Sequence, residues 1–169
     1  RREYARGEFY ATDVITDYAI DFAARARELH KPLFLHVAYN APHFPLQAPR
    51  ERIDHYMEIY LKGWDTIREE REARLRRLGL LSDEEQAAGR GVVPTSQFID
   101  RTRPVPAWEE LPEEQRHDLA RRMAIYAAMI DIMDRNIGRL VEALRDNGQL
   151  ENTLLLFLSD NGACAEPHT

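Results

Sequence analysis

The apolar residues of this chain are arranged in two ways, at helical spacing in long segments and as short uninterrupted runs. Between residues 12 and 29 they recur every three or four positions, as on one face of a helix that Lys31-Pro32 would end. Residues 33–38 and 153–158 are short apolar runs beside turn-forming residues, which is typical of strands buried in a parallel sheet. The pattern therefore predicts a helix and a strand in the first part of the chain and a second strand in the last part.

The longest helical pattern covers residues 112–146. Pro112 suits the first position of a helix, two glutamates follow in the first turn, and Asn147-Gly148 is a typical stop signal. The apolar residues step by alternating fours and threes: Leu119, Met123, Tyr126, Ile130, Met133, Ile137, Leu140 and Leu144. Such a stripe also suits a coiled coil, but it is short and leads directly into the second predicted strand. This favours a core-facing crossover helix.

The segment between the first strand and the long helix is less regular. Residues 50–88 have a strongly charged and mostly helical pattern, with Gly79 as a stop signal and with Ser82 and Glu85 at the spacing of a capping box. Residues 89–107 contain three prolines and are predicted to form a long irregular connection. A connection of that length in a compact domain is commonly functional or mobile.

The order of these elements predicts an α/β fold. Two strands joined by a long helical crossover should be parallel and connected with right-handed topology, so both should end at the same edge of the sheet. The loop after the first strand contains His43 between Pro42 and Pro45, and the loop after the second contains Asp160 and Asn161. Because ligands bind beyond the carboxyl ends of such strands, these three polar side chains are candidates for one site.

The residues alone leave two interpretations of each loop open. Asp160 and Asn161 offer oxygen donors that suit Ca²⁺ or Mg²⁺, but two ligands do not complete a site, and Ser-Asp-Asn-Gly is also an ordinary turn sequence. A fixed imidazole at His43 could donate to an anionic substrate or protonate a leaving group, or it could be a surface histidine that caps the backbone. His36 lies within the first predicted strand and is expected to be a satisfied core residue or a residue on the underside of the sheet.

Composition excludes several classes of function. The 169 residues, 44% of them hydrophobic, are enough for one globular core. A net charge of −6 would repel a phosphate backbone, so no nucleic-acid partner is expected, and no run approaches the roughly 20 apolar residues of a transmembrane span. The single cysteine, Cys164, excludes an internal disulfide and a multi-thiolate metal site. The sequence has no His-Glu-x-x-His, no Gly-x-Ser-x-Gly and no phosphate-binding glycine loop.

A set of motifs in matching order resembles the type I sulfatases, the formylglycine-dependent arylsulfatase family of the alkaline-phosphatase-like superfamily. The matching motifs are Tyr10-Ala-Thr-Asp13 and the helix after it, Pro32-Leu-Phe-Leu35, Ala41-Pro-His-Phe-Pro45, Tyr56 and Tyr60 with Lys62-Gly-Trp-Asp65 and Arg68, Met123 to Gly138, and Asn152 to Gly162. Glu58 and Leu61 depart from the family pattern, which has Gly and Asp at these positions. One motif alone would be weak, whereas the set in this order is specific.

The resemblance implies a three-layer alkaline-phosphatase-like α/β sandwich, with parallel strands and crossover helices, that cleaves a small-molecule or glycan sulfate ester. It implies that Asp160 and Asn161 are ligands of a divalent cation, Ca²⁺ or Mg²⁺, and that His43 hydrogen-bonds the sulfate or the bridging ester oxygen. The family nucleophile is a formylglycine made from a Cys/Ser-x-Pro-x-Arg motif. Cys164 is followed by Ala-Glu-Pro-His, so it does not match this motif and is not expected to be the modified residue.

Residues 1–169 are therefore expected to be an internal part of a sulfatase catalytic domain and to be inactive alone. Two alternatives remain. One is a phosphodiesterase or phosphonate monoester hydrolase of the same superfamily, which shares the cation and histidine arrangement. The other is a non-catalytic scaffold or interaction protein. Family analogy predicts a periplasmic, extracellular or lysosomal location, and these residues do not specify the ester.

Overall fold

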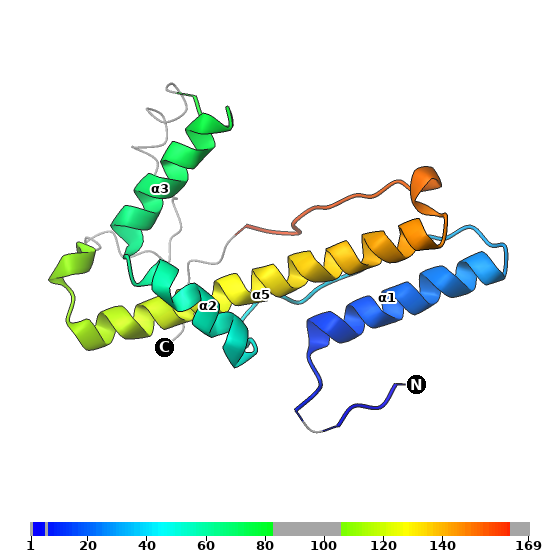
Figure 1. Cartoon of the computed structure of the whole chain (residues 1–169), viewed down its shortest axis with the longest axis horizontal. Helices are drawn as coiled ribbons and strands as arrows, with labels where there is room; N and C mark the ends of the chain where they lie inside the picture. Colours follow the sequence, from blue (N-terminus) through cyan, green and yellow to red (C-terminus); the bar gives the residue numbers. More distant parts are fainter. Residues whose placement is uncertain (1, 6, 83–105, 163–169) are drawn as a thin grey trace. The chain divides into compact units, whose positions relative to one another are not determined.

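The structure is a computed structural model that describes residues 2–5, 7–82 and 106–162. Its elements are α1 (Ala11–Glu28), α2 (Arg50–Tyr60), α3 (Trp64–Arg77), η1 (Trp108–Glu110), α5 (Glu113–Asp146) and η2 (Leu150–Asn152) (Figure 1). The chain divides into two compact units instead of the single core that composition suggested. Unit 1 comprises Arg1–Met57 and Arg121–Leu156, and unit 2 comprises Glu58–Ala120 and Phe157–Thr169. Within the described residues, every helix is too short or too polar to cross a bilayer.

The predicted helices are present. The helix expected over residues 12–29 is α1, and the one expected over 112–146 is α5. Gly148 ends α5 as its sequence signal indicates, because its φ of +68° is a left-handed conformation that glycine adopts without strain. The helical pattern of residues 50–88 forms α2 and α3, which are interrupted before Trp64. The expectations for residues 83–105, which include most of the long connection, lie outside the described part of the chain.

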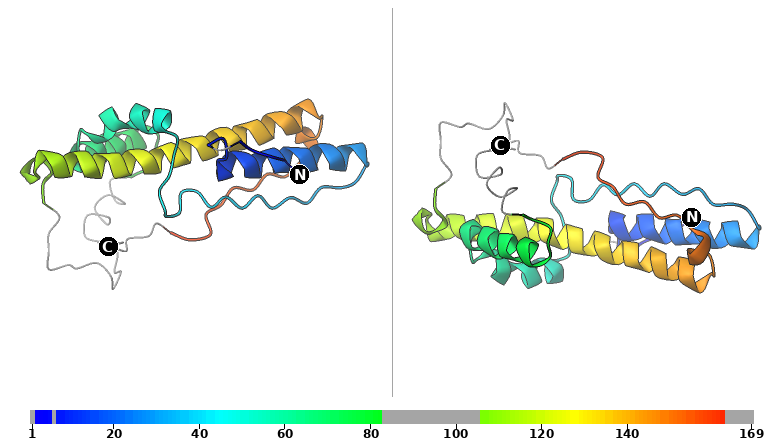
Figure 2. Two further views of the ribbon diagram at one scale, coloured as in Figure 1. Left: turned by 90° about the horizontal axis from the view of Figure 1, so that it is seen from below. Right: turned by 90° about the horizontal axis from the view of Figure 1, so that it is seen from above.

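The two predicted strands are not paired into a sheet among the described residues, so the layers of the predicted fold stay a prediction. Residues 33–38 and 153–158 are extended but belong to no strand in the part of the chain that is described (Figure 2). Burial still alternates along residues 33–39, with odd-numbered side chains half-buried and Phe34 95% exposed. A strand needs neighbours to pair its backbone groups, and a single extended segment has none. His36 is exposed, so it is not a core residue among the described residues.

Helix α1 packs against α5 within unit 1 through small side chains (Figures 1 and 2). The buried residues of α1 are Thr12, Thr16, Ala19 and Ala23. On α5, Ala124 and Ala128 are completely buried, whereas Met123 and Ile130 are 46% and 38% exposed. The predicted core stripe is therefore only partly buried: its last member, Leu144, is 3% exposed, whereas Met123 and Ile130 remain accessible.

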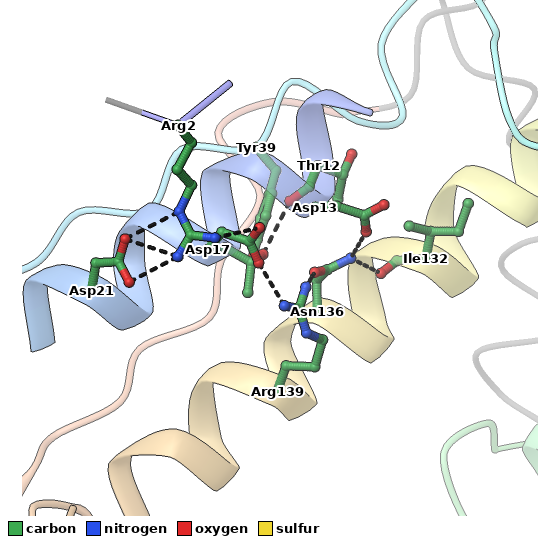
Figure 3. Close-up of polar contacts among 10 residues, drawn as sticks. Arg2, Thr12, Asp13, Asp17, Asp21, Tyr39, Ile132, Asn136 and Arg139 are labelled. Atoms are coloured by element: carbon green, nitrogen blue, oxygen red, sulfur yellow. Dashed lines mark hydrogen bonds and ion pairs between the residues drawn. The ribbon is translucent and has the colours of Figure 1, made fainter. Parts of the chain in front are cut away.

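A polar network fixes the register of the two helices (Figure 3). Asn136 is 2% exposed, and its amide nitrogen donates to a carboxylate oxygen of Asp13 at 2.7 Å and to the Ile132 carbonyl at 2.9 Å. Arg139 donates to the Asn136 side-chain oxygen and to Asp17. Because a buried amide without partners is costly, sliding one helix along the other would lose several hydrogen bonds at once.

Replacing Asn136 by Ala should lower the free energy of unfolding by about 1–3 kcal/mol, since Asp13 and Arg139 would lose a buried partner. Urea denaturation of the protein measures this change. Arg145→Ala, on the same helix, removes only a fully exposed pair with Glu142 and should leave the unfolding midpoint essentially unchanged. Equal midpoints for the two variants would show that the network does not stabilise the helix pair.

Unit 2 is organised around Trp108, which is 5% exposed. Its ring meets that of Trp64 edge-on, with 4.9 Å between ring centroids, and its backbone N–H donates to a carboxylate oxygen of Asp65 at 3.1 Å. Gly63, which precedes α3, has φ +84° and ψ 160° and lies directly against the indole. The contact thus joins the start of α3 to η1 across the long connection.

Candidate functional site

The loop that contains His43 is tightly turned and exposed. The His43 backbone N–H donates to the Asn40 carbonyl at 2.9 Å, and Ala41, between them, is buried. Prolines at positions 42 and 45 remove two backbone donors and restrict the chain on either side of the histidine. The imidazole therefore projects from a short constrained turn, in accordance with the rigid loop that the sequence indicates.

The imidazole of His43 is oriented by its own loop. Its Nδ1 lies 2.6 Å from the Phe44 carbonyl oxygen. A carbonyl can only accept a hydrogen bond, so Nδ1 must be the protonated nitrogen. This leaves Nε2 as the atom available to a ligand, as an acceptor in the neutral ring and as a donor in the imidazolium.

The loop at residues 159–162 is a bend whose polar side chains are exposed. Ser159 Oγ donates to the Asn161 carbonyl at 2.6 Å, which closes the bend. Within the described chain, the side chains of Asp160 and Asn161 make no hydrogen bond, so their oxygens remain available. A carboxylate next to a carboxamide is a donor set that fits a hard cation such as Ca²⁺ or Mg²⁺.

The described residues contain no complete cation site. Nowhere among residues 2–5, 7–82 and 106–162 do three or more His, Cys, Asp or Glu side chains gather as a metal ion would require. His43 belongs to unit 1, and Asp160 and Asn161 belong to unit 2. Their convergence at one sheet edge stays a prediction.

Sequence reasoning missed the residues that hold the His43 loop. Tyr39 OH lies 2.7 Å from Thr16 Oγ1, and Tyr10 OH donates to the Gln47 carbonyl at 3.1 Å. Burial, which outweighs an opposing interaction with Thr12, raises the pKa of Tyr10, so this phenol keeps its proton at neutral pH. The available signal was the pair of threonines at positions 12 and 16, which place hydroxyls on the otherwise apolar face of a helix.

The two loops contain the residue types of a hydrolase that acts on an anionic ester: an oriented imidazole and oxygen donors for a cation. The family model described as Sulfatase matches residues 1–168, and the chain therefore belongs to the sulfatase family. The family implies an alkaline-phosphatase-like fold, and its members are sulfuric ester hydrolases that generally use a formylglycine and a divalent metal ion.

Individual relatives agree with the family match. An arylsulfatase of Klebsiella aerogenes is 40% identical over 140 residues, which are 82% of this chain and 27% of the relative. An uncharacterized sulfatase of Schizosaccharomyces pombe is 36% identical over 155 residues, 92% of this chain and 26% of the relative. Human iduronate 2-sulfatase is 25% identical over 162 residues, 90% of this chain and 26% of the relative. The chain thus spans about a quarter of the length of the curated relatives it matches.

Proposed function

We propose that this chain is part of the catalytic domain of a sulfuric ester hydrolase of the arylsulfatase type. The observation on which this rests is the family match over residues 1–168, which includes both the His43 loop and the Ser-Asp-Asn-Gly loop. In the complete domain, the extended segments 33–38 and 153–158 are parallel strands of an alkaline-phosphatase-like sandwich. Their exposed apolar side chains, among them Phe34 and Leu154, are then covered by neighbouring layers.

Asp160 and Asn161 are the proposed ligands of a divalent cation, Ca²⁺ or Mg²⁺. The support is chemical, because both side chains offer oxygen atoms that no other described group occupies. Asp160 and Asn161 would hold the cation, which would supply Lewis-acid polarisation of the sulfate oxygens when bound. Further ligands have to come from other parts of a longer polypeptide, since such ions take six or more oxygens.

His43 is the proposed contact to the sulfate or to the bridging ester oxygen. Its Nδ1–H is committed to the Phe44 carbonyl, so contact with the substrate falls to Nε2. The imidazolium donates from Nε2 to a sulfate oxygen or gives its proton to the leaving alcohol. The nucleophile, a formylglycine by family analogy, is proposed to lie outside these residues, because Cys164 does not match its motif.

A substrate comparison in a sulfatase that contains this chain tests the proposed activity. Nitrocatechol sulfate should be hydrolysed at a higher kcat/KM than a nitrophenyl phosphodiester or a phosphonate monoester of similar size. A preference for either phosphorus ester would reassign the enzyme to the related phosphodiesterase or phosphonate hydrolase class. Absence of all three activities in the folded, metal-loaded protein would favour a non-catalytic scaffold.

The 169-residue chain alone should hydrolyse no nitrocatechol sulfate and should bind Ca²⁺ weakly at best, because it provides two proposed ligands and no nucleophile. Product absorbance over long incubation and a calcium titration by calorimetry measure the two quantities. The complete enzyme at the same concentration is the positive control. Turnover by the chain alone above the buffer rate would contradict the assignment of the nucleophile to another segment.

A further inference from the structure

The first two turns of α1 hold both ends of the loop that contains His43. The loop begins after the extended segment at Tyr39 and continues to Gln47. Tyr39 is hydrogen-bonded to Thr16 of α1, and Gln47 to Tyr10, the residue immediately before α1. His43 lies midway between the two attachment points. All of these residues belong to unit 1, so the arrangement is internal to one compact unit.

The attachment at Tyr39 has a defined direction. Thr16 is completely buried, and its hydroxyl donates to the Thr12 carbonyl at 3.0 Å. A hydroxyl has one proton, so Thr16 Oγ1 must accept in its 2.7 Å bond with Tyr39 OH, and the tyrosine must donate. The two bonds form a relay from the Tyr39 hydroxyl through Thr16 to the backbone carbonyl of Thr12; Tyr39 and Thr12 are labelled in Figure 3.

The second attachment is at the other end of the loop. Tyr10 is the residue immediately before α1, and its hydroxyl donates to the Gln47 carbonyl at 3.1 Å. Burial raises the pKa of Tyr10, so the phenol keeps its proton and remains a donor at neutral pH. Thus two hydroxyls, from Tyr10 and Tyr39, fix the entrance and the exit of the loop with respect to one helix.

We propose that Thr16, Tyr39 and Tyr10 are positioning residues that set the direction of the His43 Nε2 atom. This inference rests on the proposed role of His43. Between the two attachments, the turn is closed by the bonds of His43 to the Asn40 and Phe44 carbonyls, so a shift of either end rotates the ring. A misplacement of about 1 Å can reduce the rate of a catalysed step roughly a hundredfold.

The test compares hydroxyl deletions in a sulfatase that contains this chain. Thr16→Val and Tyr39→Phe should each lower kcat for nitrocatechol sulfate about tenfold, with a much smaller change in KM, because bound substrate remains but the imidazole is displaced. Tyr10→Phe should lower kcat less, about threefold, because its bond is more exposed. Thr16→Ser keeps the hydroxyl and should retain most of the activity.

A matched control comes from the same helix. Tyr18 has a hydroxyl that accepts from the Arg2 backbone N–H, and among the described residues no hydrogen bond joins this hydroxyl to residues 39–47. Tyr18→Phe should therefore leave kcat and KM unchanged. Metal content and the unfolding midpoint are measured for each variant. If Thr16→Val does not fold, Tyr39→Phe still tests the proposal, because it removes the hydroxyl and retains the aromatic ring.

Combination with a His43 deletion separates positioning from general damage. His43→Ala should lower kcat at least tenfold, and in that background Thr16→Val should have almost no further effect, because there is no imidazole left to position. A full tenfold loss on top of His43→Ala, or no loss in the wild-type background, would overturn the positioning role. Unchanged kcat in His43→Ala itself would instead overturn the proposed function of His43.

A spectroscopic measurement gives a readout independent of turnover. In ¹⁵N spectra of the neutral imidazole, His43 should be the tautomer protonated at Nδ1, as the bond to Phe44 requires. Tyr39→Phe should increase the fraction protonated at Nε2, whereas Tyr18→Phe should not. An unchanged tautomer ratio in Tyr39→Phe would count against the inference even if kcat falls.

Discussion

Asp160→Ala should reduce the turnover of a sulfatase that contains this chain by about a thousandfold or more, and the purified variant should lose its bound divalent metal. The side chain is exposed at the end of a closed bend and has no partner in the described structure, so its truncation removes a ligand without disturbing packing. A catalytic cation supplies several kcal/mol of charge stabilisation, which corresponds to a change of this size. Elemental analysis and kcat with nitrocatechol sulfate measure the two effects.

Controls for this prediction come from the neighbouring sequence. Glu151→Ala removes another exposed carboxylate shortly before the same loop and should leave metal content and kcat unchanged. Asp160→Asn keeps one oxygen donor but removes the charge, so it should retain more metal than Asp160→Ala and should be partly rescued by excess Ca²⁺. Metal content and kcat near wild-type values in Asp160→Ala would show that the Ser-Asp-Asn-Gly loop is an ordinary turn.

Local signals were sufficient to predict the helices. Pro112 and Asn147-Gly148 mark the ends of α5. Both signals act through the backbone geometry of one or two helical turns, which a short stretch of sequence determines. The buried face of α5 could not be predicted in this way. It depends on which segments approach the helix: Ala124 and Ala128 are completely buried, whereas the larger residues Met123 and Ile130 remain partly exposed.

The strands and the candidate site depend on contacts between distant segments. Residues 33–39 have the alternating burial of a strand, yet nothing in the described structure pairs with their backbone, so local pattern and tertiary structure differ there. Asp160, Asn161 and His43 were identified from loop chemistry and family motifs. The hydroxyls of Thr16 and Tyr39 meet across 23 positions, and no local pattern predicts such a pair.

Gly63→Ala should destabilise unit 2 by about 3 kcal/mol or more. A Cβ at this position would lie 2.3 Å from Cγ and 2.4 Å from Cδ1 of the buried Trp108 ring, far inside contact distance. The backbone at φ +84° and ψ 160° is also in a region that only glycine adopts readily. Overpacking and backbone strain each cost about 1–3 kcal/mol, and here they act together. Urea denaturation followed by tryptophan fluorescence measures the loss, since Trp64 and Trp108 both lie in this unit.

Two comparisons separate the clash from the backbone strain. Gly79 also has a positive φ, +67°, but a Cβ there would meet nothing within 4 Å, so Gly79→Ala should cost only about 1–2 kcal/mol. In a Trp108→Ala background the ring is absent, so Gly63→Ala should lose the cost of the clash. Only the backbone strain at position 63 should then lower the free energy of unfolding, by an amount closer to that of Gly79→Ala. If Gly63→Ala were no worse than Gly79→Ala in the wild-type background, the close packing of Gly63 on Trp108 would not exist in solution. Another interaction would then have to hold the start of α3 against η1.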